Sequence, residues 1–204
     1  MKVAVVGGAG KMALGIILDF VENKEVEEIL LLDINEELLA ARKKELNCEK
    51  VKTSVVNIYE TENVGRLLYD IDVTVNASSH IFNMAVMDAC LIGKSGYTDL
   101  GGLYHWALDQ LKRNEDFKKA GITGIVGSGS APGVVSVMAK YGYDLMDTVE
   151  SVRIYDGITN FSNPGYNFIP PYSLNTIMDE FSAKNYEFKD GRHLEQPAFS
   201  GEEE

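Results

Sequence analysis

The sequence contains little of what a disulfide framework or a metal site needs. Among its 204 residues are two cysteines, Cys48 and Cys90, and they form no Cys-x-x-Cys pair. The spacing therefore gives no support for a disulfide scaffold or a cysteine zinc site. The three histidines are scattered along the chain, and none lies at a metal-ligand spacing from another. We expect no metal site.

Positive charge and long apolar runs are also scarce. Lysine and arginine total 19 against 31 acidic residues, so the formal net charge is −12. Nucleic acids and anionic membranes bind clustered Lys and Arg, and we expect neither as a partner. No apolar run approaches the roughly 20 residues of a membrane span. The first residues lead straight into a strand pattern without the features of a signal peptide, which predicts a cytoplasmic protein.

Short β-rich runs alternate with amphipathic helical stretches over residues 1–147. The predicted strands cover residues 3–6, 29–32, 51–56, 73–76, 96–99 and 122–126. The predicted helices cover residues 11–22, 35–46, 60–69, 83–92, 103–120 and 133–145, with Met138, Tyr141 and Leu145 of the last one in the core. Strands that are apolar throughout are typical of a parallel sheet covered on both faces. The pattern predicts an α/β fold with a doubly wound parallel sheet.

The composition changes near Asp147, and residues 148–204 form a second predicted unit. It has a predicted strand at 149–155, a short helix at 172–181 and a hairpin that joins 186–188 to 193–194. So few elements make a thin core for this length, so we expect a partial α+β substrate or dimerisation domain. Its uncovered sheet edge and apolar face predict self-association, as a homodimer.

A glycine-rich turn follows the first predicted strand. The stretch GAGKMA at residues 8–13 fits the pattern G-x-G-x-x-G/A, with Ala13 as the small residue that packs helix on strand. Glycine is required there because a Cβ would keep phosphate oxygens from the backbone N–H groups at the helix N-terminus. The turn predicts a Rossmann-type dinucleotide-binding domain over residues 1–147.

An acidic residue lies where this fold places the one that binds the adenosine ribose. Asp33 ends the second predicted strand, and it follows Ala13 at the spacing of about 20 residues. Its carboxylate would repel a 2′-phosphate, and Ile34 and Asn35 offer no positive charge. We therefore expect NAD rather than NADP. The alternative is that Asp33 only caps the helix that begins at Asn35.

Other strand ends meet the same crevice, because parallel strands carry their carboxyl ends to one edge of the sheet. Asn57 ends the third strand, where adenine would lie, and residues 77–79 follow the fourth, where the pyrophosphate or nicotinamide ribose would lie. The predicted cofactor-binding residues are Gly8, Gly10, Lys11, Met12, Asp33, Ile34, Asn57, Ala77, Ser78 and Ser79.

Several further segments identify a family. They are VGGAGKMA at 6–13, LDIN at 32–35, GYTDL at 96–100, GSAPGVVSVMA at 129–139, and the tail segments PYSL at 171–174, FKDG at 188–191 and PAFSGE at 197–202. With these the chain resembles the saccharopine dehydrogenase-like family, which includes lysine 6-dehydrogenases, saccharopine reductases and carboxynorspermidine dehydrogenases. The resemblance spans essentially the whole chain. Members of the family are longer, so we expect a truncated substrate domain.

The resemblance implies an NAD(P)-dependent oxidoreductase that moves hydride between nicotinamide and the C–N group of lysine, saccharopine or a related amine. Asp99 is then the candidate acid–base group or partner of the substrate ammonium, and the alternative is a turn cap beside Gly101. The predicted substrate-side residues are His80, Ser130, Pro132 and Gly133, with the helix N-terminus near Gly133 favouring a substrate carboxylate. The other class of function is a nucleotide-binding module without turnover of its own.

Overall fold

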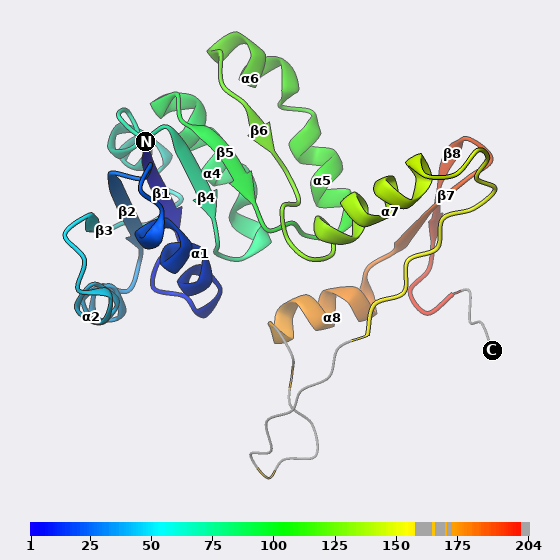
Figure 1. Cartoon of the computed structure of the whole chain (residues 1–204), viewed down its shortest axis with the longest axis horizontal. Helices are drawn as coiled ribbons and strands as arrows, with labels where there is room; N and C mark the ends of the chain where they lie inside the picture. Colours follow the sequence, from blue (N-terminus) through cyan, green and yellow to red (C-terminus); the bar gives the residue numbers. More distant parts are fainter. Residues whose placement is uncertain (158–164, 166–169, 171–172, 201–204) are drawn as a thin grey trace.

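A six-stranded parallel sheet forms the centre of the protein, as the computed structural model shows for residues 1–157, 165, 170 and 173–200 (Figure 1). Its strands are β1 (Lys2–Val6), β2 (Glu28–Asp33), β3 (Val51–Val55), β4 (Val73–Asn76), β5 (Gly96–Asp99) and β6 (Gly124–Ile125). They lie in the order β3-β2-β1-β4-β5-β6, and each neighbouring pair is parallel. This is the predicted doubly wound sheet. Successive strands are added on one side of β1 up to β3 and on the other side from β4 onward, so the strand order reverses between β1 and β4.

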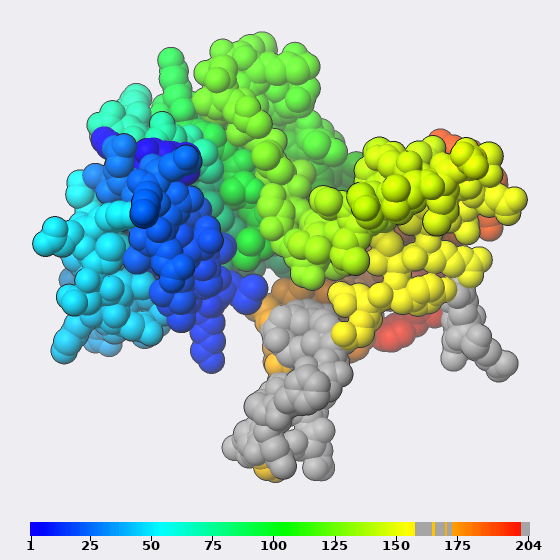
Figure 2. Space-filling model, in the orientation of Figure 1, coloured from blue at the N-terminus to red at the C-terminus, as the bar shows by residue number. Residues whose placement is uncertain are grey.

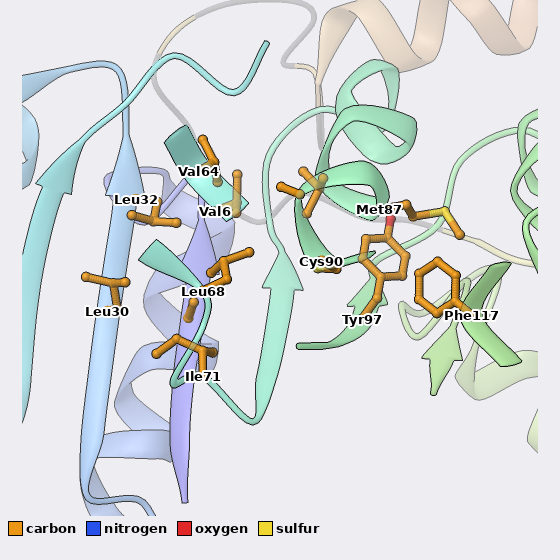
Figure 3. Close-up of a cluster of buried hydrophobic side chains, with 13 residues drawn as sticks. Val6, Leu30, Leu32, Val64, Leu68, Ile71, Met87, Cys90, Tyr97 and Phe117 are labelled. Carbon is orange, nitrogen blue, oxygen red and sulfur yellow. The ribbon is translucent and has the colours of Figure 1, made fainter. Parts of the chain in front are cut away.

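Helices cover both faces of the sheet. They are α1 (Lys11–Glu22), α2 (Glu36–Leu46), α3 (Thr61–Leu67), η1 (His80–Phe82), α4 (Asn83–Gly93), α5 (Tyr104–Leu111) and α6 (Asn114–Ala120). A further helix, α7 (Val134–Asp144), follows β6. Because successive strand residues point to opposite faces, Val5 of β1 packs with α1 and α2, whereas Val6 packs with α3 and α4. Figure 3 shows Val6 in that second core with Leu68, which follows α3. Burial there raises the pKa of the Cys90 thiol to about 12, so this cysteine is a core residue and not a nucleophile.

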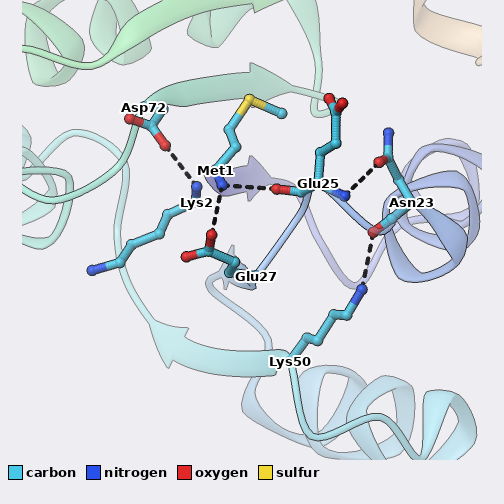
Figure 4. Close-up of polar contacts among 7 residues, drawn as sticks. All are labelled: Met1, Lys2, Asn23, Glu25, Glu27, Lys50 and Asp72. Carbon is cyan, nitrogen blue, oxygen red and sulfur yellow. Dashed lines mark hydrogen bonds and ion pairs between the residues drawn. The ribbon is translucent and has the colours of Figure 1, made fainter.

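The amino ends of the strands are joined by a separate group of polar contacts (Figure 4). The ammonium of Met1 donates to the Glu25 carbonyl oxygen at 2.7 Å, and the Lys2 N–H donates to the Asp72 carboxylate at 2.7 Å. These contacts tie β1 to the segments that precede β2 and β4. They stabilise the edge of the sheet opposite the glycine-rich turn.

One of the predicted helices is divided into two helices in the structure. Residues 103–120 form α5 and α6, and the chain turns at Lys112 and Arg113 between them. The turn lets Arg113 pair with Asp88 of α4, at 2.6 Å between Nη2 and Oδ1. It also brings Phe117 of α6 into the core, edge-on to Tyr97. Periodicity alone did not indicate the break because both halves carry helical spacing.

The second unit contains α8 (Leu174–Ser182) and a hairpin of β7 (Asn185–Lys189) and β8 (Arg192–Gln196). The hairpin prediction is confirmed, with positive φ at Asp190 (52°) and Gly191 (74°), as a two-residue turn of type I′ requires. The strand predicted at 149–155 is wrong: this segment is irregular, it is exposed except for half-buried Val149, and it forms no ladder with a described strand. The motif residues at 171–172 and 201–202 lie outside the described residues.

Helix α7 is exposed, which corrects the prediction that its apolar stripe is core. Met138, Tyr141 and Leu145 expose 66%, 68% and 69% of their surface, and α7 has no buried residue. In Figure 1 and Figure 2 the helix extends from the sheet edge toward the hairpin. Helical spacing predicted one apolar face correctly, but no described element covers it. Within the described part of the chain, no helix has the length and apolar character needed to cross a membrane.

Candidate nucleotide-binding site

The glycine-rich turn between β1 and α1 is tied to the end of β2. The N–H groups of Gly7 and Gly8 donate to the Leu32 carbonyl oxygen at 2.8 and 3.1 Å, and the Gly10 N–H donates to the Gly7 oxygen at 2.8 Å. Gly7 has φ of 76°, which a residue with a side chain rarely adopts. The motif match began at Gly8, so Gly7, the residue of this turn with positive φ, was left outside it.

Two glycines of this turn lie too close to their neighbours for a side chain. A Cβ on Gly8 would lie 2.8 Å from the Leu31 Cβ, and a Cβ on Gly7 would lie 2.8 Å from the Ser78 Cβ. Ser78 follows β4, so the turns after β1 and β4 touch at the point where the strand order reverses. This is the crevice in which doubly wound sheets bind nucleotides.

Helix α1 begins at the turn, and no side chain among the described residues caps its first N–H groups. Its N-cap is Gly10, and its first turn contains no acidic residue. Free N–H donors and the positive end of the helix dipole favour an anion there, and the absence of Cβ atoms lets its oxygens approach the backbone. Ala13 is fully buried as predicted, whereas Lys11 and Met12 are exposed beside the turn. The site fits the pyrophosphate of a dinucleotide.

Asp33 holds the turn from the β2 side. One carboxylate oxygen accepts the Ala9 N–H at 3.1 Å, and the other accepts the Asn35 N–H at 3.1 Å. The cap of α2 is Asn35 itself, whose side-chain oxygen accepts the Leu38 N–H at 2.9 Å. Asp33 therefore does not cap the helix, and its carboxylate lies at the turn, at the carboxyl end of β2.

Arg42 of α2 holds the same turn from the carbonyl side, and sequence reasoning missed it. Its Nη2 donates to the carbonyl oxygens of Ala9 and Gly10 at 3.3 and 3.2 Å, and its Nη1 pairs with Glu45 at 2.8 Å. The side chain is 10% exposed, and its Nε is buried without a hydrogen-bond partner in the described residues. The available signal was its place three residues after buried Leu39, on the face of α2 that meets the sheet.

A pocket of about 370 Å³ lies at the ends of β2 and β3. Two predicted cofactor residues, Ile34 and Asn57, line it together, along with Glu60 and Arg66 of the segment that follows. This is the position expected for adenine. A larger pocket of about 730 Å³, lined by Asp72, contains none of the predicted site residues. It lies at the amino ends of β4 to β6, the edge at which these sheets do not bind ligands.

Asp99 ends β5 beneath the surface, with 1% of its surface exposed. One carboxylate oxygen accepts the N–H groups of Gly101 and Gly127 at 2.7 and 2.8 Å. The other accepts from the Tyr97 hydroxyl and the Gln110 amide, each at 2.6 Å. Burial and the neighbouring Asp99 raise the pKa of Tyr97 far above its ordinary value, so Tyr97 stays a donor. The turn-cap bond to Gly101 is present, and an acid–base role for Asp99 stays a prediction.

The predicted substrate-side residues meet around the loop that follows β5. A Cβ on Gly101 would lie 2.6 Å from Pro132, and one on Gly102 would lie 2.9 Å from His80. His80 is 7% exposed, and its Nε2 lies 3.4 Å from the Asp179 carboxylate of α8, which links the two units. Its ring lies edge-on to Trp106.

The N-terminus of α7 differs from the expectation that it favours a substrate carboxylate. The Val134 and Val135 N–H groups donate to the carbonyl oxygens of Gly129 and Ser130 at 3.0 and 3.1 Å. These donors are therefore engaged within the loop itself. Exposed Ser130 and half-buried Gly133 lie beside Pro132 at the end of β6, and their roles toward a substrate stay predictions.

Comparison with known proteins places this site in a family. Residues 3–125 match the family described as the saccharopine dehydrogenase NADP binding domain. Carboxynorspermidine synthase of Vibrio alginolyticus is 29% identical over 168 residues, which cover 74% of this chain and 39% of that protein. Carboxyaminopropylagmatine dehydrogenase of a Synechocystis species is 27% identical, over 70% of this chain and 37% of its own length. The chain thus spans well under half of these relatives.

The fold has a solved counterpart in saccharopine dehydrogenase (L-Glu forming) from Saccharomyces cerevisiae. The TM-score is 0.61 at 18% sequence identity, and the alignment covers 71% of this chain and 31% of that one. At this identity the likeness concerns the fold alone. The family match, by contrast, covers more than half of the chain and includes the glycine-rich turn, Asp33 and Asp99. The protein therefore belongs to the saccharopine dehydrogenase NADP binding domain family.

Proposed function

We propose that the chain is the nucleotide-binding part of an oxidoreductase that transfers hydride between NAD(P) and the C–N group of an amino acid or related amine. The observation that carries this proposal is the glycine-rich turn, closed to Cβ atoms and open to phosphate at the uncapped start of α1. The relatives named as a synthase and a dehydrogenase of amine-bearing compounds support the reaction class. The nicotinamide supplies the hydride chemistry, and the protein residues bind and orient.

Turnover with an amine is the direct test of this proposal. With NAD⁺ and a panel of lysine, saccharopine and diamines, we expect reduced nicotinamide to accumulate with at least one of them. The measurement is the absorbance of the reduced cofactor over time, with the protein omitted as the control. Nucleotide binding without turnover on any of them would instead favour a binding module, and absence of nucleotide binding would contradict both functions.

NAD is the proposed cofactor in preference to NADP, although the family description names NADP. Support comes from the Asp33 carboxylate at the end of β2, which would repel a 2′-phosphate. The Arg42 guanidinium does not offset this repulsion, because Glu45 pairs with its charge and two loop carbonyls engage its Nη2. Ile34 and Asn35 add no charge.

Removing the Asp33 charge should change the cofactor preference. We expect Asp33→Asn to bind NADP⁺ about tenfold more tightly than the unmodified protein does, because the repulsion is gone while the single amide oxygen still accepts the Ala9 N–H, at the loss of the bond from the Asn35 N–H. Titration calorimetry with NAD⁺ and NADP⁺ measures both affinities. Glu37→Gln, which removes an exposed charge from the first turn of α2, is the control and should leave the preference unchanged. An unmodified protein that prefers NADP⁺ would contradict the assignment.

A further inference from the structure

Four buried polar side chains form a continuous hydrogen-bonded chain beneath the carboxyl edge of the sheet. Asn76, Asn83, Asp99 and Gln110 are 1%, 1%, 1% and 3% exposed. Gln110 Nε2 donates to Asp99 at 2.6 Å, Asn83 Nδ2 donates to Gln110 at 3.2 Å, and Asn76 Nδ2 donates to Asn83 at 2.7 Å. The four residues lie on four different elements of the fold, and the three bonds join β5 to α5, α5 to α4 and α4 to β4. Burying a polar group is costly unless it is hydrogen-bonded, and here each amide forms a hydrogen bond with the next.

The two ends of the chain set the direction of every bond in it. At one end the Asp99 carboxylate only accepts, so Gln110 must present its amide nitrogen. At the other end the Ser78 N–H only donates, to Asn76 Oδ1 at 3.0 Å, so Asn76 must present its oxygen there. The orientations of the amides between these two ends satisfy both requirements. A change at Asp99 that reversed one amide would therefore create a mismatch further along.

The chain connects the cofactor side of the site with the substrate side. Ser78 touches the turn at Gly7, where a Cβ would lie 2.8 Å from its Cβ. Asp99 accepts the N–H groups of Gly101 and Gly127, and both of these glycines lie against Pro132. The loops after β4, β5 and β6 thus rest on one buried network.

We propose that Asp99 is a positioning residue, and that the chain from Asp99 through Gln110, Asn83 and Asn76 holds the cofactor loop and the two substrate-side loops in a fixed relation. A carboxylate that already accepts four hydrogen bonds and is 1% exposed has no place for a substrate ammonium. This inference rests on the proposed function for its purpose, and it replaces the acid–base role of Asp99.

A charge exchange along the chain tests the proposal. Asp99→Asn turns an amide nitrogen toward the Gln110 nitrogen, and Gln110→Glu sets a second carboxylate 2.6 Å from Asp99. The double variant restores the pairing between positions 99 and 110, because the new amide at position 99 would donate to the new carboxylate at position 110. The Tyr97 hydroxyl, which donates to Asp99 in the unmodified protein and lies 3.1 Å from the Gln110 nitrogen, would donate to that carboxylate instead. That carboxylate would still accept from Asn83. Backbone hydrogen exchange at Ser78, Gly101 and Gly127, measured without nucleotide, reports on both ends of the chain.

We expect each single variant to exchange about tenfold faster at all three amides, and the double variant to return to within about twofold of the unmodified protein. Gln110→Asn, which is too short to span the chain, is the second single variant should Gln110→Glu not fold. Thr98→Val removes the exposed bond to Ser128 at the same edge and should leave Ser78 unchanged.

Two results would overturn the proposal: a double variant no better than the singles, or acceleration confined to Gly101 and Gly127 with Ser78 unaffected. The exchange experiment needs no ligand, so its outcome is independent of whether NAD⁺ binds. Titration of the same four proteins with NAD⁺ tests the proposed function separately. If the unmodified protein binds no nucleotide, the proposed function is wrong. The proposal for the hydrogen-bonded chain is still tested by the hydrogen-exchange rates.

Discussion

Gly7→Ala should reduce NAD⁺ affinity by about a hundredfold or more, which is the largest functional effect we expect from a single methyl group. The native φ of 76° costs a residue with a side chain about 1–2 kcal/mol. The added Cβ would lie 2.8–2.9 Å from the backbone and side chain of Ser78, so the turn after β1 or the turn after β4 must move. Either movement displaces the donors that face the pyrophosphate. Titration calorimetry with NAD⁺ measures the loss.

Gly15→Ala is the matched control, since it makes the same substitution within α1. Gly15 is exposed, and nothing lies within 4 Å of where its Cβ would be. We expect it to stabilise the protein by about 0.5–1 kcal/mol, because alanine favours helix more than glycine does. Its NAD⁺ affinity should be unchanged. Equal affinities of Gly7→Ala and Gly15→Ala would show that the turn does not hold the nucleotide.

Arg42→Met should weaken NAD⁺ binding by about tenfold to thirtyfold. Methionine retains much of the apolar stem that packs under α2, but it loses both bonds to the carbonyl oxygens of Ala9 and Gly10. Hydrogen bonds from a charged donor contribute about 1.5–3 kcal/mol where the group is largely buried, as this guanidinium is. Without them the turn relaxes before nucleotide arrives, and binding must reorder it. Calorimetric titration measures the change in Kd.

Lys43→Met controls for the loss of one positive charge from α2, because Lys43 is exposed on the next position. Its NAD⁺ affinity should remain within about twofold of the unmodified protein. Arg42→Lys should recover only part of the affinity, since an ammonium is a point charge and lacks the fork that spans two carbonyls. If Arg42→Met and Lys43→Met weaken binding equally, the effect is one of net charge and not of positioning.

Much of the site could be predicted because its parts are local in sequence. The glycine-rich turn, the acid at the end of β2 and the six strands each depend on a few consecutive residues, and one rule places all the strand ends at a common edge. The predicted cofactor residues accordingly follow β1 to β4, and Asp99 ends β5. Asn35 as the α2 cap was likewise readable from its position before a helical run.

The residues that were missed act across the fold. Arg42 reaches a turn more than 30 residues away, and Gln110 joins β5 to α4 through an amide group of a kind that is common on surface helices. Spacing predicts the face of a helix but not the element that it meets, which is why Arg42 was unnoticed and the α7 stripe was wrongly placed in the core. The strand at 149–155 failed for a similar reason: local pattern does not show which strand a segment would pair with, and this segment forms no ladder with a described strand.

The edge-on contact between His80 and Trp106 gives the protein a built-in optical reporter. The chain has one tryptophan, so tryptophan emission, excited at wavelengths that the ten tyrosines do not absorb, arises from one place, beside an imidazole that directly follows the β4 loop. The same imidazole meets Asp179 of α8. Emission intensity and wavelength therefore report on the joint between the nucleotide-binding unit and α8, and a stopped-flow fluorometer could follow that joint in real time without any added label.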